Sequence, residues 1–598
     1  MKNISIEKII SRTLIWGASC CLILSFVSCK KFLDRTPLDQ VSEPEFWKTP
    51  QQLDAYIVGK YDWLPGQLGA NAQVGYYADD VSSDNMVNGL AYNKFLNGNE
   101  SAITPASGGA WNWGAIREIN IFFDNYKKCT TPFATYQQTY GEACFLKALR
   151  YHQLVMALGD VPWYSNSISM SDQAALQKAR DPRALVVDSI MGLINQSITY
   201  LKPRASVGVN RINRETALIY KSRVALFEAS WSKYHAGTPS ASSVNANKYF
   251  QIAIDAFNTF KTDYGFTGKL YTADGPTKSY YNLFGKFDYA AIPEVTLSKS
   301  YSVALGVVNG MGIIYQYAYG GGNSYTLSLA QSYLKNDGTS IDILSPGAIS
   351  GAGSAYLTDL ANKLDPRFKQ SVFIPGDPIS NFAPYVGVLF TAPQAGTTDA
   401  GALVGFTPKK GHNVATSLAA ADPQVAGISF RIPELMLNYV EAYVELNGTF
   451  PNLSDNIDLL RQRVGMPTLT SVKPVVTASW PNYGYPVSDA IAIVRQERRV
   501  ELAGEGYRTN DWKRWRAHAL FSGKRPRGFL YSAADYGPGT TGGKVVYLDA
   551  NGYTDPYKNS LPGSYQFSKP DRDYLSPLPM DQLILNKKLV QNPNWDKP

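Results

Sequence analysis

Residues 140–158 read YGEACFLKALRYHQLVMAL, and this stretch gives the clearest structural signal in the chain. One apolar row repeats at the three- and four-residue spacing of a helix face, through Ala148, Tyr151, Val155 and Leu158. A second row lies beside it, through Phe145, Leu149, His152 and Met156. A stripe of that width indicates a helix buried on two sides. Gly159, Asp160 and Pro162 follow and supply a stop signal.

Other segments have the same helical period. In 211–233 the apolar row is Ala217, Tyr220, Val224, Phe227 and Trp231, and in 433–447 it is Leu435, Tyr439, Ala442 and Leu446. Further helices fit 453–464 and 487–506. Successive amphipathic helices with short connections predict a mostly α fold of stacked helical hairpins, as in tetratricopeptide arrays. No clean 34-residue period is present, so any repeat is degenerate.

The middle of the chain differs in composition. Across 265–430, Gly, Ser, Pro and Tyr rise, and β-like runs occur at 294–298 and 370–374. We interpret this part as a loop-rich insertion with short strands. The predicted division is a signal peptide at 1–28, an anchor and extended segment at 29–50, N-terminal helices at 51–264, the insertion at 265–430, and C-terminal helices with an irregular tail at 431–598.

The N-terminus predicts export and lipidation. Lys2, Lys8 and Arg12 precede an apolar run, 14–27, that is too short to cross a bilayer, which favours a cleaved signal peptide over a membrane anchor helix. The stretch SFVSCKKFLD, 25–34, then resembles a bacterial lipobox, with cleavage before an acylated Cys29. Lipid chains there would anchor the protein to a membrane without spanning it. The alternative is that Cys29 is an ordinary thiol.

Charge and composition argue against nucleic acid as a partner. The formal charge is +8, and it becomes +6 once the signal segment leaves. We find no basic run that would serve as a phosphate-binding stripe. The chain is instead rich in rings, with 39 Tyr and 11 Trp, which suits binding of molecules with apolar faces and polar rims, such as carbohydrates. Cys129 and Cys144 either pair or remain separate buried thiols, and we favour the second.

Signatures of catalysis and of metal binding are missing from the sequence. It contains no GxSxG elbow, no HExxH, no complete P-loop and no Cys/His metal pattern, so we predict no catalytic residue and no cofactor. A two-carboxylate glycosidase site leaves no local motif, and Asp79, Asp80 and Asp84 are candidates for one. We favour a role in holding a turn. Asp549 to Asp555 faintly resembles a calcium loop but lacks its full spacing and terminal Glu.

Particular motifs resemble the SusD/RagB family of outer-membrane nutrient-binding lipoproteins, nearly from Cys29 to Trp595. The matching segments occur in family order: KKFLDRTPLDQVSEPEFWKTPQQLDAYIVGKY (30–61), DDVSSDN (79–85), GEACFLKALRYHQLVMALGDVP (141–162), NKLDPRF (362–368), FRIPELMLNYVEAYVELNG (430–448), LRQRVGMP (460–467), QERRVELAGEGYRTNDWKRW (496–515), DYLSPLP (573–579) and LVQNPNW (589–595). Each segment is weak alone, but their order over the whole chain is specific.

The resemblance implies four tetratricopeptide-like units supporting a loop-rich binding face. It implies a lipid anchor in the outer membrane, facing the cell surface. It also implies a partner, a SusC-like TonB-dependent transporter, to which the lipoprotein delivers an oligosaccharide. A peptide ligand is the alternative within the family, and a surface hydrolase is a third, less favoured function.

The first predicted ligand site lies in IIYQYAYGGGNSYTL (313–327). If this segment is extended, Tyr315, Tyr317 and Tyr319 project from one face at about 7 Å intervals. Such rings suit stacking on successive sugars, with Asn323 and Tyr325 just beyond. The alternative is an inward strand face whose tyrosines belong to the core.

Two further segments are candidates. In 75–95 the predicted ligand residues are Tyr76, Tyr77, Asp80, Asn85, Tyr92 and Asn93, and Trp113 is added from the segment after it. These residues either contact ligand or order the loop. WPNYGYP (480–486) is a third aromatic loop.

Two charged or aromatic motifs are interpreted as structural. In 496–515, Glu497, Glu501 and Glu505 share a helix face and arginines lie nearby, which predicts an ion-paired network that holds the terminal helices. QNPNW (591–595) predicts an anchoring plug with Trp595 buried.

Overall fold

The computed structural model describes residues 46–66, 80–89, 92–102, 109–309, 323–383, 386–393, 404–415, 425–536, 540–541 and 544–596. The longer helices are α4 (Pro50–Val58), α6 (Gly114–Asn125), α7 (Gln137–Leu158), α9 (Arg183–Tyr200), α11 (Arg214–Tyr234), α12 (Ala246–Tyr264), α16 (Ser354–Lys363), α18 (Ile432–Asn447) and α20 (Asp489–Glu501). Shorter ones are α8 (Gln173–Leu176), α10 (Arg204–Val207), α13 (Ser279–Phe284), α15 (Leu327–Ala330), α17 (Arg367–Ser371), α19 (Ile457–Arg463), α21 (Arg508–Arg514), α22 (Ala533–Tyr536), α23 (Pro570–Asp573) and α24 (Met580–Leu585).

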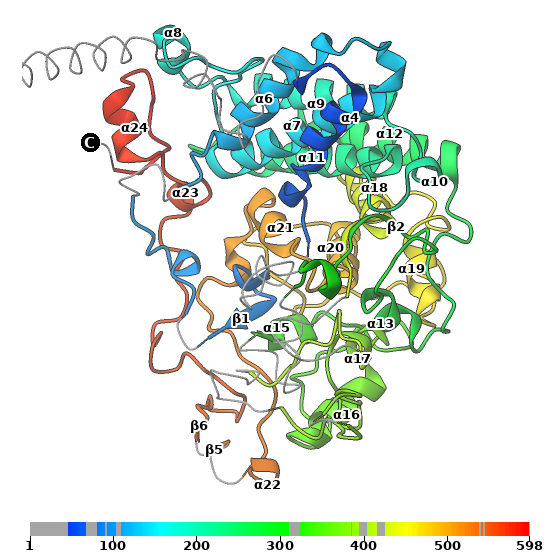
Figure 1. The fold of residues 1–598 in the computed structure, drawn as a ribbon. Coiled ribbons are helices and arrows are strands. Elements are labelled where there is room, and N and C mark those ends of the chain that lie inside the picture. The colour runs from blue at the N-terminus through cyan, green and yellow to red at the C-terminus, as the bar shows by residue number, and fades with distance from the viewer. Residues whose placement is uncertain are drawn as a thin grey trace, which may run out of the picture.

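A stack of helices forms one half of the molecule (Figure 1). Helix α7 packs on α9, α9 on α11, α11 on α12, and both α11 and α12 on α18, which in turn contacts α20. Their apolar faces belong to one continuous core whose residues run from Trp47 to Leu589. The predicted mostly α fold of tetratricopeptide-like hairpins is confirmed.

Local sequence signals account for the helix ends. Asn213, Asn245 and Ser488 accept backbone N–H bonds at the starts of α11, α12 and α20, and so cap them. Gly159 ends α7 with a φ of 75°, a conformation that favours glycine. The helices predicted at 140–158, 211–233, 433–447, 453–464 and 487–506 correspond to α7, α11, α18, α19 and α20.

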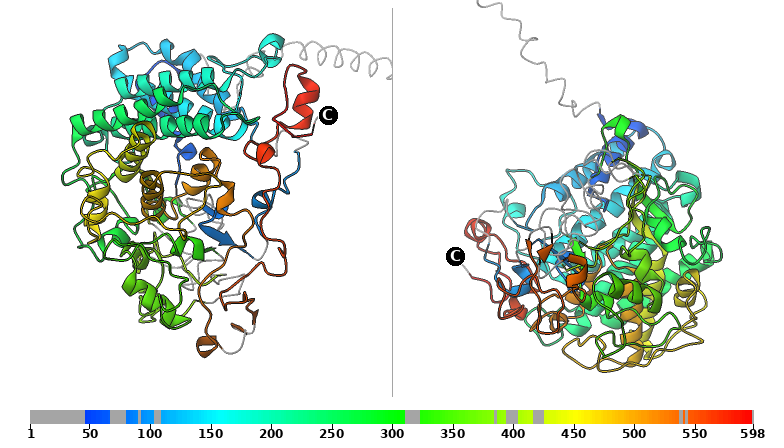
Figure 2. Two further views of the ribbon diagram at one scale, coloured as in Figure 1. Left: turned by 180° about the vertical axis from the view of Figure 1, so that it is seen from behind. Right: turned by 90° about the horizontal axis from the view of Figure 1, so that it is seen from below.

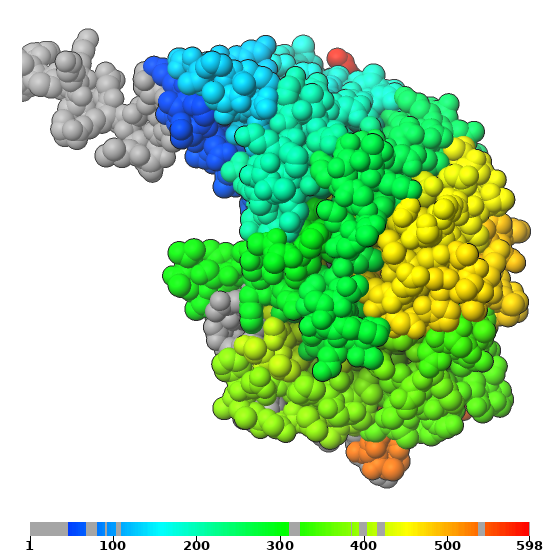
Figure 3. Space-filling view, turned by 90° about the vertical axis from the view of Figure 1, so that its right-hand side faces the viewer, coloured from blue at the N-terminus to red at the C-terminus, as the bar shows by residue number. Residues whose placement is uncertain are grey.

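The other half is rich in loops and has its own smaller cores, one of which contains Tyr325, Phe368, Phe406 and Phe529. Among the described residues, three two-stranded antiparallel pairs occur here and at its border: β1 (Met86–Asn88) with β3 (Asn323–Tyr325), β2 (Val295–Lys299) with β4 (Gly427–Arg431), and β5 (Thr540–Thr541) with β6 (Lys544–Val545). In the space-filling view this half, in green and lime, lies below the teal helices (Figure 3).

The strand expected at 294–298 is present as β2, but the one expected at 370–374 is wrong. Residues up to Ser371 belong to α17, and Val372 makes only an isolated bridge to Pro408. The helix forms because Arg367, in its first turn, is fully buried against Asp365 and Glu497. Tertiary ion pairing therefore overrides the β-like composition.

The C-terminal segment returns to the helical half (Figure 2). Arg180 donates to the carbonyl of Val590 at 2.8 Å and to Asn592 at 2.7 Å. Trp595 is buried, and its indole N–H donates to the Leu575 carbonyl at 2.9 Å. The predicted plug is confirmed.

Two other structural expectations are also confirmed. Cys129 and Cys144 are separate, buried thiols. His152 is buried in α7, where it lies 3.3 Å from Glu228. Within the described ranges, no helix combines the length and apolar character required to cross a membrane.

Candidate functional site

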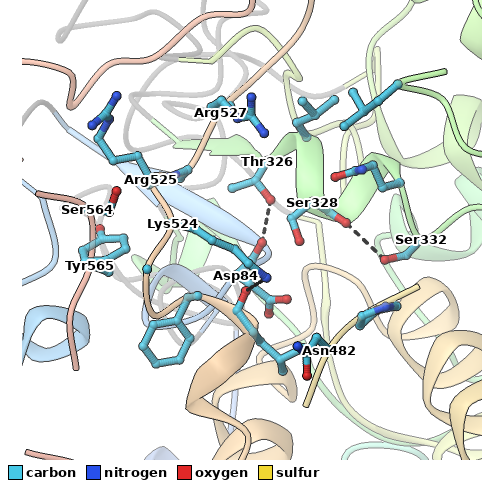
Figure 4. A pocket seen from close by; sticks show the side chains of 18 of the residues that line it. Asp84, Thr326, Ser328, Ser332, Asn482, Lys524, Arg525, Arg527, Ser564 and Tyr565 are labelled. Atoms are coloured by element: carbon cyan, nitrogen blue, oxygen red, sulfur yellow. Dashed lines mark hydrogen bonds between the residues drawn. The ribbon is translucent and has the colours of Figure 1, made fainter. Parts of the chain in front are cut away.

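A cleft of about 560 Å³ opens where distant segments of the chain meet (Figure 4). We call it the polar cleft, since hydroxyl, amide and charged side chains dominate its lining. It is lined by Ser83, Asp84, Thr326, Leu327, Ser328, Gln331, Ser332, Leu344, Ala478, Ser479, Trp480, Pro481, Asn482, Arg499, Leu520, Phe521, Gly523, Lys524, Arg525, Pro526, Arg527, Asp549, Asp555, Ser564 and Tyr565.

Backbone pairing brings these segments together. Strand β1 pairs with β3 in the register Val87 to Ser324. Just beyond β3, the Thr326 N–H donates to the Asn85 carbonyl at 2.9 Å, and the Leu327 N–H donates to the Arg527 carbonyl at 2.7 Å. The acidic turn, the segment after β3 and the segment around 527 are therefore joined by hydrogen bonds at the cleft.

A buried ion pair stabilises one wall. The Arg508 guanidinium donates to both carboxylate oxygens of Asp84, at 2.7 and 2.9 Å. Arg499, from α20, donates to Asn85 at 2.8 Å and to Ser332 at 2.7 Å. Burial alone would raise the pKa of Asp84, but Arg499 and Arg508 outweigh it and hold that pKa well below its usual value. The carboxylate stays ionised, and the wall is fixed before any ligand arrives.

Another part of the rim is cationic. Lys524, Arg525 and Arg527 follow one another along one segment (Figure 4). Arg525 donates to Asp555 at 2.7 and 3.0 Å, and Arg527 donates through Nη1 to Asp549 Oδ2 at 2.7 Å. Lys524 is exposed, and its ammonium group donates to the Leu520 carbonyl at 3.2 Å.

The faint calcium resemblance falls on this rim. Asp549 Oδ1 accepts the N–H groups of Asn551 and Tyr553, at 2.8 and 3.0 Å, while both Asp549 and Asp555 pair with arginines. Their carboxylates therefore serve the loop's own structure. In the part of the chain that the structure describes, no group of three or more His, Cys, Asp or Glu side chains is arranged to hold a metal.

Neutral polar groups and rings complete the lining. Gln331 is half-buried, and Trp480 and Asn482 belong to the aromatic loop singled out in the sequence. Tyr565 packs edge-on against Tyr92, with the ring centres 6.4 Å apart. Rings beside hydroxyl and amide groups suit a ligand with apolar faces and many hydroxyls.

The predicted residues Asp80 and Asn85 are buried next to the cleft and hold the elements that form its wall. Asp80 is fully buried and accepts the N–H groups of Gly504 and Arg508, at 2.8 and 3.2 Å. Asn85 is buried and accepts from Arg499. These contacts favour the interpretation in which the acidic turn orders its own loop, with Asp84 as the member that reaches the cleft.

Four more predicted residues lie close to the cleft without lining it. Asn323 and Tyr325 are buried in β3, where Asn323 accepts from the Asn88 amide at 2.7 Å. The Asn93 N–H donates to the Tyr565 hydroxyl at 3.1 Å, next to Tyr92.

Trp113 lies apart from this group. It lines a more apolar pocket of about 330 Å³ between α6, the segment around Tyr164 and α24. Its indole packs edge-on against Trp111 and Tyr164, with ring centres 5.2 and 5.5 Å away. The remaining predicted residues, Cys29, Tyr76, Tyr77, Tyr315, Tyr317 and Tyr319, are outside the described residues.

The cationic rim was not predicted from the sequence. Its signal is short, Lys524-Arg525-Pro526-Arg527, with three cations in four residues. So short a cluster does not make a long phosphate-binding stripe. The proline and the following Gly528 mark the cluster as a loop, the usual place for ligand contacts.

Comparison with known proteins gives a consistent result. The model of the SusD family matches residues 272–595. Among curated relatives, the SusD-like protein P38 of Formosa agariphila is 24% identical over 233 residues, which are 38% of this chain and 44% of that protein. The SusD-like protein P25 of the same organism is 25% identical over 232 residues, 35% of this chain and 42% of that protein. The matched part thus spans less than half the length of either relative.

Solved structures match over nearly the whole chain. A SusD-like protein from Bacteroides fragilis has a TM-score of 0.69 at 20% identity, covering 94% of this chain and all of its own. A SusD-like carbohydrate-binding protein from the same species has a TM-score of 0.68 at 20% identity, covering 91% of this chain and all of its own. At these identities the match establishes a common fold.

Proposed function

This chain belongs to the SusD family, and we propose that it is a glycan-binding protein whose polar cleft captures an oligosaccharide. The observation that carries this proposal is the lining itself, in which Trp480 and Tyr565 lie among hydroxyl, amide and guanidinium groups. Sugars need that combination, because their ring faces are apolar and their rims are hydroxyls. The name of the carbohydrate-binding relative from Bacteroides fragilis supports the same ligand class.

We also propose that the predicted tyrosine segment extends the site. Tyr319 is followed by three glycines and then by Asn323, and Thr326, three residues after Asn323, lines the cleft. A ligand that occupies the cleft would then continue along Tyr315, Tyr317 and Tyr319. Replacing all three by Ala should weaken binding of long oligosaccharides more than that of short ones.

The biological setting follows from the family resemblance and is part of the same proposal. Lipidated Cys29 would anchor the protein at the outer surface of the outer membrane, and a SusC-like TonB-dependent transporter would receive the ligand. The Cys29→Ala variant should leave the membrane fraction while it still binds ligand. Retention of that variant in the membrane would contradict the lipid anchor.

The test of the ligand class is retardation in native gels that contain polysaccharides, followed by calorimetry with oligosaccharides and with peptides. Gln331→Ala removes one amide from the cleft and should weaken glycan binding by roughly 3- to 10-fold, the value of one hydrogen bond. The matched control is Gln251→Ala, an exposed glutamine on α12 outside the cleft. Binding of peptides but of no glycan would replace the proposal by the peptide alternative.

A further inference from the structure

We propose that the polar cleft selects acidic glycans and that Arg527 and Lys524 bind a sugar carboxylate. This inference rests on the proposed function and specifies its substrate class. Its basis is the hydrogen bonding of the charged groups that line the cleft.

The acidic side chains in the lining are already satisfied. Both oxygens of Asp84 accept from Arg508, and both oxygens of Asp555 accept from Arg525. Asp549 uses one oxygen for two backbone N–H groups and the other for Arg527. Their carboxylate oxygens therefore bind the protein's own donors. The charged groups that remain to contact a ligand in the cleft are cations.

The cations differ in how many donors they have already used. Arg499 is buried, and its donors reach Asn85, Ser328 and Ser332. Arg525 uses three nitrogens on Asp555 and on the Pro562 carbonyl. In both arginines the Nε–Nη2 edge is therefore already occupied by protein acceptors.

Arg527 keeps such an edge. Its only hydrogen bond within the described residues runs from Nη1 to Asp549, so Nε and Nη2 have no protein acceptor there. Its side chain is 37% exposed, which places this edge within reach of a ligand in the cleft. The Nε and Nη2 donors of a guanidinium are parallel, and their spacing matches the two oxygens of a carboxylate.

Lys524 adds a second cation on the same rim. It is exposed, and within the described residues its ammonium group makes one hydrogen bond, to the Leu520 carbonyl. Two N–H donors remain for a ligand. A neutral sugar would offer no anionic acceptor to the free Nε–Nη2 edge of Arg527 or to the remaining donors of Lys524, whereas a uronic acid supplies a carboxylate beside the same hydroxyl groups.

The experiment compares matched ligands. Polygalacturonate, alginate and glucuronoxylan fragments are tested beside their carboxyl-reduced forms, which keep the backbone and lose the charge. At least one acidic form should bind about tenfold or more tightly than its reduced form, and its affinity should fall as salt rises. Equal binding of both forms would overturn the acidic-glycan inference and leave glycan binding intact.

Variants identify the side chains. Arg527→Gln should cost about tenfold or more in affinity for the acidic form and little for the reduced form. Arg527→Lys keeps the charge beside Asp549 but loses the paired donors, so it should recover only part of the affinity. Lys524→Gln should lower the affinity for the acidic form less than Arg527→Gln does. The control is Arg214→Gln, since Arg214 pairs with Asp263 on the helical half and is 27% exposed.

Three other results would contradict the carboxylate assignment, the role of Arg527 or the proposed function. Preference for sulfated over carboxylated glycans would overturn the carboxylate assignment. If Arg527→Gln weakens acidic and reduced ligands equally, the side chain contributes shape and not charge recognition, and the inference fails. Retardation by no polysaccharide at all would overturn the proposed function together with this inference. Circular dichroism of each variant confirms that the fold is retained.

Discussion

Glu501, the last residue of α20, accepts hydrogen bonds from three arginines on three other elements. Arg431 and Arg463 lie 2.7 and 2.6 Å from Oε1, and Arg367 lies 3.2 Å from Oε2. The carboxylate is fully buried. Burial by itself would raise the pKa of Glu501, but the arginines, Arg463 foremost, hold it far below its usual value. The network predicted for 496–515 is thus confirmed, with most of its partners outside that segment.

Replacing Glu501 by Gln should be strongly destabilising, because three buried guanidinium groups lose their shared anion. We expect a loss of about 3–5 kcal/mol in the free energy of unfolding, measured by urea denaturation at pH 7. Glu118→Gln is the control, since Glu118 pairs with Lys60 at the surface and is 46% exposed. That change should cost less than about 1 kcal/mol. Similar losses for the two variants would contradict a structural role for the network.

The segment 524–530 carries the cationic rim and is fixed by its backbone. The Gly528 N–H donates to the Thr554 carbonyl at 3.0 Å, and the Phe529 N–H donates to the Val404 carbonyl at 2.9 Å. A Cβ on Gly528 would lie only 1.7 Å from the Val404 oxygen. A glycine is therefore required here by the close approach of two backbones.

Gly528→Ala should displace this segment and with it Arg527. We expect ligand affinity to fall by about tenfold or more and stability by about 1–3 kcal/mol, while the helical signal in circular dichroism is kept. Calorimetry and urea denaturation measure the two effects. The control is Gly192→Ala in α9, where an added methyl meets no atom within 4 Å. It should be neutral or stabilise by up to about 1 kcal/mol. Unchanged affinity in Gly528→Ala would contradict the role of the segment.

The helices were predictable from the sequence because their apolar period is local, as in α7 and α11. The strand expected at 370–374 failed because Arg367, upstream of it, is paired with residues far along the chain. The site was less predictable for the same reason. Asp84 and Arg527 both line the cleft because β1 pairs with β3 and the Leu327 N–H donates to the Arg527 carbonyl. No local pattern in either segment reveals the other. Sequence similarity identified the acidic turn that lies at the cleft. It did not reveal that Asp80 is buried inside the turn while Asp84 lines the cleft.

Buried histidines tie the stability of the whole molecule to pH, and His235 and His412 are two of them. His235 stacks on Trp231 in the helical half, with ring centres 3.9 Å apart, and His412 contacts Tyr281 and the Ile379 carbonyl in the loop-rich half. Burial lowers the pKa of His235 to about 3 and that of His412 to about 4, from 6.5. Both are neutral in the folded protein and gain a proton on unfolding at acid pH.

The direction of this pH dependence follows from the number of protons that the folded and unfolded chains bind. The unfolded chain binds more protons than the folded one below pH 6.5, so stability is full above that pH and falls toward pH 4 and 3. Each histidine should contribute a slope of about 1.4 kcal/mol per pH unit in that window. The pKa values of the Glu228 and Glu441 carboxylates are lowered to about 2, so these groups reduce the stability further only below about pH 4.5.

Urea denaturation between pH 7.5 and 4.5 measures this slope. His412→Gln should reduce it by about one proton, because the glutamine does not titrate. A slope that is unchanged in His412→Gln would show that the folded protein accommodates the charged imidazole.

The order in which the chain is made has a consequence for the cleft. The contacts of α7, α9, α11 and α12 join neighbours along the sequence and close short loops. The cleft joins Asp84 to Lys524 and Tyr565, so its contact order is far higher. The pairs formed by α7, α9, α11 and α12 are complete in sequence by Tyr264, whereas the residues that complete the cleft lie beyond Ser479 and as far as Tyr565. The cleft is therefore expected to form late in folding, and a fragment that ends before Lys524 lacks part of its lining.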